Sequence, residues 1–164
     1  MKVLLIAAIS ADGYIAHADD ELVSWTSKED KKLFVELTKQ AGVVVMGSKT
    51  FLTIGMALPG RRNVVYSRQE LREPNIELTQ ERPVQLVARL KQEGEHAIAV
   101  CGGRAVYDMF LGAGVVDELY LTVEPVIFGQ GVGLVGSPLD LSLRLVDCKP
   151  LNKNSMLLHY EVLR

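Results

Sequence analysis

Short apolar runs bounded by turn residues recur along most of the chain and are typical of buried strands. They predict strands at 3–9, 43–46, 63–66, 96–100 and 117–123. Between these runs, apolar residues return at helical spacing. The predicted helices are one that starts at Thr26 or Ser27 and includes Leu37, a short one after Gly47, and two more at 83–92 and 104–111.

The last part of the chain has a different pattern. A glycine-rich loop at 129–136 is followed by two strand candidates at 143–148 and 156–163. The alternation of strands and helices predicts an α/β fold with a mostly parallel central sheet, helices on both faces and a C-terminal antiparallel edge hairpin. At 164 residues, the chain is expected to form one domain over 1–164. Ligands of such folds bind beyond the carboxyl ends of the strands.

Composition and charge argue against several classes of protein. With 48% hydrophobic and 23% charged residues, the chain is typical of folded rather than disordered proteins. Its 18 basic and 20 acidic side chains leave no surplus for binding nucleic acid, so no nucleic-acid partner is expected. Cysteines and histidines show no ligand spacing, so no metal is expected. No segment is long and apolar enough to span a bilayer, which predicts a cytoplasmic protein without a membrane partner.

Two features suggest a ligand site at the carboxyl ends of the strands. Gly102-Gly103 follows a strand and opens a helix, where backbone amides can hold a phosphate, although a plain tight turn also uses two glycines. Asp30 lies one helical turn before Phe34 and could act on a proton if both face a pocket. An acid in the first turn also simply complements the helix dipole. Trp25 lies at the start of the same helix.

Several polar residues near predicted strand ends could contact charged groups. Arg61 follows a proline-glycine turn and suits a carboxylate. Lys49, Ser67 and Arg68 could contact a phosphate, and Thr122 lies near the end of its strand. Each of these residues, taken alone, is also typical of an ordinary protein surface or sheet face.

Taken in order, these segments resemble dihydrofolate reductase from the first strand to about Thr122. The spacing of Trp25, Asp30 and Phe34 is similar to that of the bacterial enzymes. The most specific stretch runs from Val45-Met46-Gly47 through Leu58-Pro59-Gly60-Arg61 to Ser67-Arg68. The segment from Gly102-Gly103 to Leu111 is similar to the glycine turn of the family, which contains a cis peptide bond.

The resemblance implies a dihydrofolate-reductase-like fold and the reduction of 7,8-dihydrofolate to tetrahydrofolate by hydride transfer from NADPH, as in one-carbon metabolism. It implies catalytic roles for Asp30, Thr122 and Trp25. The substrate-binding residues that it implies are Ile6, Ala7, Asp30, Phe34, Ile54, Leu58, Arg61 and Tyr107. The cofactor-binding residues are Ala8, Ile15, Gly47, Ser48, Lys49, Thr50, Ser67, Arg68, Cys101, Gly102, Gly103, Arg104, Ala105, Val106 and Tyr107.

Other segments resemble a relative with the same fold, the reductase half of the riboflavin-pathway deaminase-reductase. They are 10–16, 25–30 and Pro125 with 127–131. Ser48 also stands where dihydrofolate reductases have an arginine for the cofactor phosphate, which leaves that contact to Lys49, Ser67 and Arg68.

Three functions therefore stay open, all with a small-molecule partner. They are a dihydrofolate reductase, a pyrimidine reductase of riboflavin synthesis and a non-catalytic nucleotide-binding module. Antifolate inhibitors are expected as further ligands of the first. The sequence allows either a monomer or a homodimer.

Overall fold

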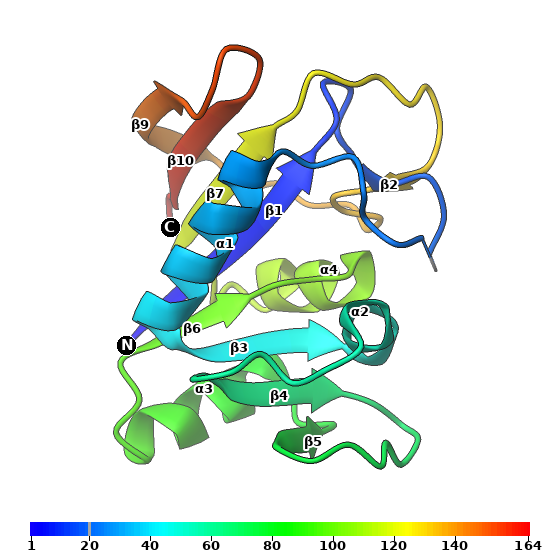
Figure 1. The fold of residues 1–164 in the computed structure, drawn as a ribbon. Coiled ribbons are helices and arrows are strands. Elements are labelled where there is room, and N and C mark those ends of the chain that lie inside the picture. Colours follow the sequence, from blue (N-terminus) through cyan, green and yellow to red (C-terminus); the bar gives the residue numbers. More distant parts are fainter. Residues whose placement is uncertain (20) are drawn as a thin grey trace.

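A computed structural model describes residues 1–19 and 21–164, and its dominant feature is an eight-stranded sheet with helices on both faces (Figure 1). The strands are β1 (Lys2–Ile9), β2 (Tyr14–Ala16), β3 (Gly42–Gly47), β4 (Arg62–Tyr66), β5 (Ile76–Thr79), β6 (Ala97–Val100), β7 (Glu118–Val123), β8 (Val132–Gly133), β9 (Leu143–Pro150) and β10 (Met156–Val162). The helices are α1 (Lys28–Ala41), α2 (Ser48–Ile54), α3 (Pro83–Gln92) and α4 (Arg104–Gly112).

The strand order across the sheet is β5-β4-β3-β6-β1-β7-β10-β9. Neighbouring strands from β5 to β7 pair in parallel, whereas β10 pairs antiparallel with both β7 and β9. The prediction of an α/β fold with a mostly parallel sheet and a C-terminal antiparallel hairpin is confirmed. The predicted bounds of α3 are also those observed.

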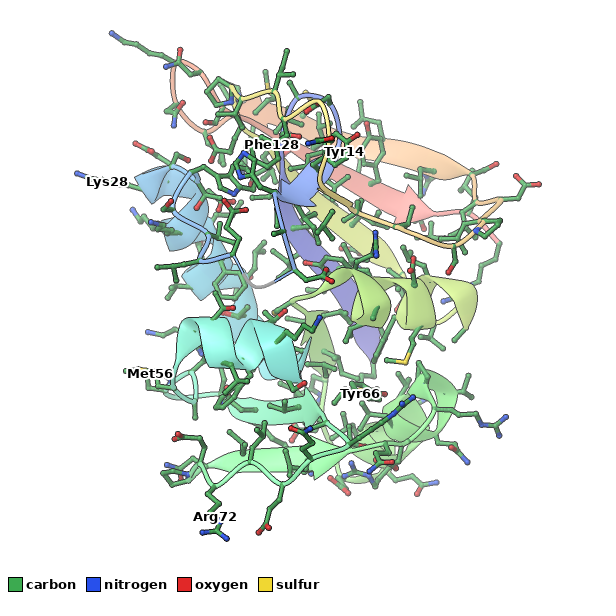
Figure 2. The ribbon with its side chains drawn as sticks, turned by 90° about the vertical axis from the view of Figure 1, so that its right-hand side faces the viewer. Tyr14, Lys28, Met56, Tyr66, Arg72 and Phe128 are labelled. Carbon is green, nitrogen blue, oxygen red and sulfur yellow. The ribbon has the colours of Figure 1, made fainter. Side chains whose placement is uncertain are left out.

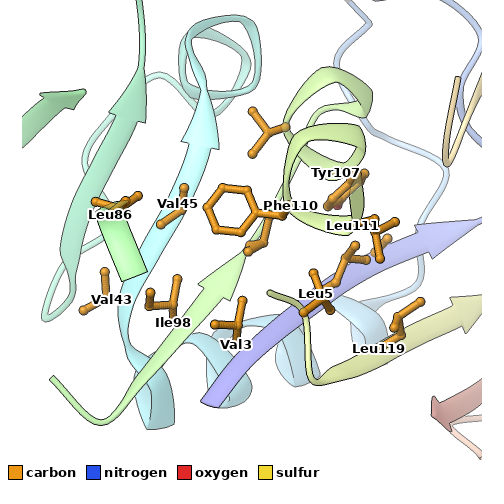
Figure 3. Packing of buried hydrophobic residues seen from close by; sticks show 14 of the residues in the cluster. Val3, Leu5, Val43, Val45, Leu86, Ile98, Tyr107, Phe110, Leu111 and Leu119 are labelled. Atoms are coloured by element: carbon orange, nitrogen blue, oxygen red, sulfur yellow. The ribbon is translucent and has the colours of Figure 1, made fainter. Parts of the chain in front are cut away.

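Each face of the sheet has its own apolar core, because successive strand residues point to opposite sides. In β1, Leu5 belongs to the core under α3 and α4, while Ile6 belongs to the core under α1 and α2. Phe110 of α4 is fully buried against the first face, as the close view in Figure 3 shows. Burial of this apolar surface, at about 25 cal/mol per Å², is the main force that holds the helices to the sheet.

The sequence pattern misses three short strands. β2 and β8 pair with each other as a separate two-stranded sheet, so the prediction that 129–136 is only a loop is wrong in part. β5 lies at the edge of the main sheet and begins directly after Asn75, a turn residue with φ 64°. Strands this short are below the length at which alternation becomes visible, so only tertiary pairing defines them.

The carboxyl ends of the parallel strands bring together segments that are distant in sequence. β3 leads into α2 and β6 leads into α4, on the side to which the arrowheads of β3 and β4 point in Figure 1. The two turns are joined by a hydrogen bond of 2.8 Å from the Gly47 amide to the Gly102 carbonyl oxygen. β1 and β7 end beside each other, since Ile9 is paired with Val123.

Candidate functional site

Two helices begin side by side at this edge with a glycine as the N-cap residue. Gly47 precedes α2 and Gly103 precedes α4, and neither helix start is capped by a side chain. Their first amides can therefore bind an anionic group, such as a phosphate, with help from the helix dipoles. Four residues that were predicted to contact a cofactor lie in the first turns of these helices. Ser48 and Thr50 belong to α2, and Arg104 and Ala105 belong to α4.

The glycine turn leaves no room for side chains. The Gly102–Gly103 peptide bond is cis, as the family resemblance implies. A Cβ atom on Gly102 would lie 3.2 Å from the Tyr107 hydroxyl, and one on Gly103 would lie 3.3 Å from the hydroxyl oxygen of Thr50. A Cβ atom on Gly47 would similarly lie 3.3 Å from a methyl group of Val106, which is buried. Val106 therefore supports the turn from below.

Asp30 lies in the first turn of α1 and faces the end of β7. The Ser27 hydroxyl caps the helix by accepting a hydrogen bond of 3.1 Å from the Asp30 amide. Burial raises the pKa of the Asp30 carboxyl above the ordinary value for aspartate. The hydroxyl groups of Thr122 and Thr26 interact with the carboxyl group and oppose this rise. The structure thus brings Asp30 and Thr122 together, as the sequence comparison implied.

A second carboxyl group, that of Glu124, lies near Asp30, and sequence reasoning missed it. The side chain is 2% exposed, although it carries an acid. Its negative charge further raises the pKa of Asp30. The available signal was an acidic residue within a run from Leu119 to Phe128 that is apolar apart from Thr122. A solvated glutamate is unusual in such a run.

One side of the site is an apolar surface between α1 and α2. Phe34, Ile54 and Leu58 pack at the edge of the core under α1 and stay partly exposed. Ile6 lies in the same core and is buried, so its side chain is covered by its neighbours. Three partly exposed apolar side chains from different segments provide a surface for a flat or aromatic ligand.

Arg61 lies at the end of this apolar surface and has no acidic partner among the residues that the structure describes. Its guanidinium donates to the Thr38 hydroxyl at 2.8 Å and to the Pro59 carbonyl at 3.1 Å. Burial lowers the pKa of Arg61 below its usual range. A cation that is held in place yet not neutralised is suited to a carboxylate ligand.

The floor of the site contains two residues that stay uncharged. Tyr107 is buried and donates a hydrogen bond of 2.7 Å to the Ile6 carbonyl oxygen. Burial raises the pKa of Tyr107 well above its ordinary value, and raises that of Cys101 to about 12. Ala7 is buried in the opposite core, whereas Ala8 is half-buried. The ends of β1 and β6 therefore present mainly backbone to a ligand.

Phe128 holds together the aromatic residues around Trp25. Its ring stacks on that of His17, with 3.7 Å between the ring centroids, and makes an edge contact with Trp25, with 5.1 Å between the centroids. The ring of Tyr14 lies farther away, with 6.4 Å between the centroids, and Figure 2 shows the side chains of Tyr14 and Phe128 close together. Within the described residues, the Trp25 indole nitrogen is a buried donor that lacks a partner. A water molecule or ligand polar atom is the usual partner for such a group.

A pocket of about 440 Å³ opens beside Trp25 and was not predicted from sequence. Its walls come from the start of α1, the segment after β7 and the turn between β9 and β10. The lining residues are Trp25, Thr26, Ser27, Glu29, Glu124, Pro125, Val126, Asn152, Lys153, Asn154 and Ser155. We call it the rear pocket, because it borders Glu124 rather than the glycine turn.

The predicted phosphate contacts fall at two places. Ser67 and Arg68 line a pocket of about 220 Å³ at the ends of β4 and β5. Lys49 lies in α2 and approaches the Asp19 carboxylate at 3.5 Å, with both side chains largely exposed. Ile15 lies in β2 and packs against the core on the α4 side.

Across residues 1–19 and 21–164, no helix combines the length and apolar character needed to cross a membrane. In the same part of the chain, His, Cys, Asp and Glu side chains do not gather in groups of three or more that could hold a metal ion.

Comparisons with known proteins define the class to which the chain belongs. The family model for dihydrofolate reductase matches residues 2–128. The dihydrofolate reductase type 3 of Salmonella typhimurium is 35% identical over 123 residues, which cover 74% of this chain and 71% of that enzyme. The chain therefore belongs to the dihydrofolate reductase family, and it is an oxidoreductase of that superfamily.

Two further comparisons show how the resemblance is distributed. The dihydrofolate reductase type A13 of Escherichia coli is 42% identical over 69 residues, but the match covers only 42% of this chain and 40% of that enzyme. The structure of a diaminohydroxyphosphoribosylaminopyrimidine deaminase/5-amino-6-(5-phosphoribosylamino)uracil reductase of Thermotoga maritima has a TM-score of 0.79 and 17% identity. The alignment covers 99% of this chain and 56% of that one, and it shows a shared fold.

Proposed function

We propose that the protein reduces 7,8-dihydrofolate to 5,6,7,8-tetrahydrofolate with NADPH. The observation that carries this proposal is the half-buried Asp30 carboxyl, with its raised pKa, beside Thr122 and near the apolar surface of Phe34, Ile54 and Leu58. A carboxyl group in such surroundings can hold the amino-pyrimidine edge of a pterin and promote protonation of the ring nitrogen that is reduced. Such an enzyme would supply tetrahydrofolate for one-carbon metabolism in the cytoplasm.

The substrate-binding residues have separate tasks in this proposal. Phe34, Ile54 and Leu58 grip the aromatic linker of the substrate, and Arg61 binds the carboxylate of its tail. Thr122 orients the Asp30 carboxyl group. Trp25 closes the site on the side of the α1 start, where its free indole N–H can hold a water molecule. Ile6 and Ala7 contribute their backbone.

The glycine turns are suited to a dinucleotide. The uncapped starts of α2 and α4 would hold its phosphates, with Ser48, Thr50, Arg104 and Ala105 around them. Ser67 and Arg68, in their own pocket, are suited to the additional phosphate that distinguishes NADPH from NADH. When bound, the nicotinamide supplies the hydride, while the protein supplies placement and a proton. The remaining predicted contacts are Ala8, Ile15, Gly47, Lys49, Cys101, Gly102, Gly103, Val106 and Tyr107.

A second candidate is a pyrimidine reductase of riboflavin synthesis. It is favoured by the structural likeness to the Thermotoga maritima reductase over 99% of this chain. The segment with Pro125 and 127–131 also resembles that group, and Asp12 holds its loop by accepting hydrogen bonds from the amides of Phe128 and Gly129. Arg61 would then have to bind the phosphate or the ribosyl group of the substrate rather than a glutamate tail.

A turnover assay separates these functions. Purified protein is mixed with NADPH or NADH and either 7,8-dihydrofolate or the ribosylamino-pyrimidine phosphate, and the loss of nicotinamide absorbance is followed. We expect NADPH consumption with dihydrofolate and slow or no consumption with the pyrimidine. The reverse result would establish the riboflavin-pathway reaction. NADPH binding without consumption in either mixture would indicate the third function, a non-catalytic nucleotide-binding module.

A further inference from the structure

Glu124 is a buried carboxylate that is held only by neutral groups. Its side chain is 2% exposed and lies directly after β7. One carboxylate oxygen accepts a hydrogen bond of 2.7 Å from the Ser27 amide, and the other accepts one from the Ser155 hydroxyl. Within the described residues, no basic group lies within salt-bridge distance of it. A buried charge without a cation is costly, so this arrangement requires an explanation.

The hydrogen bonds of Glu124 lead directly to Asp30. The backbone amide of Ser27 donates a hydrogen bond to the Glu124 carboxylate. The Ser27 hydroxyl oxygen accepts a hydrogen bond from the backbone amide of Asp30. The same serine is the N-cap of α1, so Glu124 fixes the start of the helix that carries Asp30. Ser155 ties this unit to the turn between β9 and β10. Three segments that are distant in sequence thus determine where the Asp30 carboxyl group lies.

The charged and titratable groups around the two carboxyl groups come from several elements. Glu124 raises the pKa of Asp30, whereas Lys31 on α1 lowers it slightly as a positive charge. Burial raises the pKa of Tyr107 on α4, and the charges of Cys101 and Asp30 add to this rise, so Tyr107 stays protonated. On the rear side, Glu29 and Lys153 line the pocket that Glu124 borders. None of these groups neutralises Glu124 by direct contact within the described residues.

We propose that Glu124 is a positioning residue for Asp30: it holds the start of α1 through Ser27 and so fixes where the Asp30 carboxyl group lies. Burial and, in addition, the negative charge of Glu124 raise the pKa of Asp30, so Asp30 keeps its proton to a higher pH than an isolated aspartate would.

The chemical use of this arrangement rests on the proposed function. Reduction of a C=N bond adds a hydride to the carbon and a proton to the nitrogen, and the nicotinamide nucleotide is oxidised by two electrons. Asp30 in its acid form gives the proton, directly or through a water molecule, and is left as a carboxylate. The carboxylate then takes a proton from solvent, so that atoms and charges balance over one turnover.

The single tryptophan allows this role of Glu124 to be tested without substrate or cofactor. Trp25 lines the rear pocket together with Glu124 and lies just before the helix that carries Asp30, so its fluorescence should change when Asp30 gains a proton. We expect a fluorescence titration with a midpoint above the ordinary aspartate pKa of about 4. Glu124→Gln removes the neighbouring charge and should lower this midpoint by about one pH unit, because the remaining carboxyl group ionises more easily. Asp30→Asn should abolish the titration attributed to Asp30.

Two control variants separate charge from packing. Ser155→Ala removes a hydrogen bond from Glu124 but keeps both carboxyl groups, so the midpoint should not fall. Glu36→Gln removes the same charge from an exposed position on α1 and should leave the midpoint unchanged. If Glu124→Gln does not fold by circular dichroism, Glu124→Met, which has a similar volume and needs no hydrogen bond, takes its place.

Three results would overturn this role of Glu124. They are a wild-type midpoint below about 4, an unchanged midpoint in a folded Glu124 variant, and an equal fall in Ser155→Ala. A failure of the proposed function looks different, since the titration would behave as expected while neither substrate is reduced. In an active enzyme, the acid-dependent limb of the kcat/KM profile should shift with Glu124→Gln in the same direction as the fluorescence midpoint.

Discussion

In two regions of the molecule, the charged side chains differ in whether they have a partner of opposite charge. At the edge formed by α3, β4 and β5, Arg62 and Arg89 lie within salt-bridge distance of several glutamates. These are Glu77, Glu81, Glu93 and Glu95. In the candidate site, Asp30, Glu124 and Arg61 have no opposite charge at such a distance among the described residues. The edge network stabilises the fold, whereas the unpaired site charges are available to a ligand or a reaction.

Arg61 and Arg62 show this contrast in two adjacent residues. Arg62 contacts Glu77 at 2.7 Å and Glu93 at 2.6 Å. Arg61 is held only by neutral oxygen atoms, and burial lowers its pKa. The residue type is the same, so the difference comes from the elements that each side chain meets. Uncompensated charge costs stability, and proteins keep it mainly where function requires it.

The largest expected effect is that of Asp30→Asn on turnover. The substitution keeps the size of the side chain but removes the acid. We expect kcat with NADPH and the preferred substrate to fall by about 10²–10⁴-fold at neutral pH, the usual contribution of a positioned proton donor. Nicotinamide absorbance measures the rate. Near-normal turnover in this variant would place the proton source elsewhere in the molecule.

The next effect is smaller and compares the neighbouring arginines. Arg61→Lys should raise KM by roughly tenfold, because a lysine loses charged hydrogen bonding worth about 1.5–3 kcal/mol. Arg62→Lys is the matched control and should leave KM unchanged. It should instead lower the melting temperature by about 2–4 °C, for a network loss of about 1 kcal/mol. If both variants changed KM equally, the two arginines would not differ in role.

The strands of the central sheet could be predicted because the apolar pattern that indicates each of them lies within the strand itself. Val43 to Met46 are all fully buried and form an unbroken apolar run, which is the pattern of a central parallel strand. The Trp25, Asp30 and Phe34 spacing could likewise be compared with a known family. The structure places Asp30 next to Thr122 as that comparison implied, although their roles remain a proposal.

Glu124 could not be predicted because its environment is non-local. Its partners are Ser27, 97 positions away, and Ser155, 31 positions away, so no sequence window contains them. The same reason applies to Arg61 and Arg62, since the glutamates that distinguish them come from β5 and from the segment after α3. Motif spacing predicts which residues approach a ligand, but it does not predict which charges are left uncompensated.

The smallest expected effect is the pH dependence of stability, which should have opposite signs in the two regions. Hydrogen bonds from Arg89 hold the pKa of Glu81 below its ordinary value. Its contribution is therefore present above the unfolded pKa of about 4.3 and is lost as the pH falls through the folded value. We expect Glu81→Gln to lower the melting temperature by about 1–2 °C at pH 7, and the difference from wild type to vanish near pH 3.

The contribution of Asp30 to stability changes with pH in the opposite direction, because burial raises its pKa in the folded state. The stability associated with its protonated form is present below the unfolded pKa of about 3.9 and is lost as the pH rises through the folded value. Asp30→Asn should therefore raise the melting temperature at pH 7 by about 1–3 °C. Calorimetric scans from pH 3 to 8 on both variants test the contrast. Destabilisation of both variants at neutral pH would show that the Asp30 site is charge-compensated like the edge network.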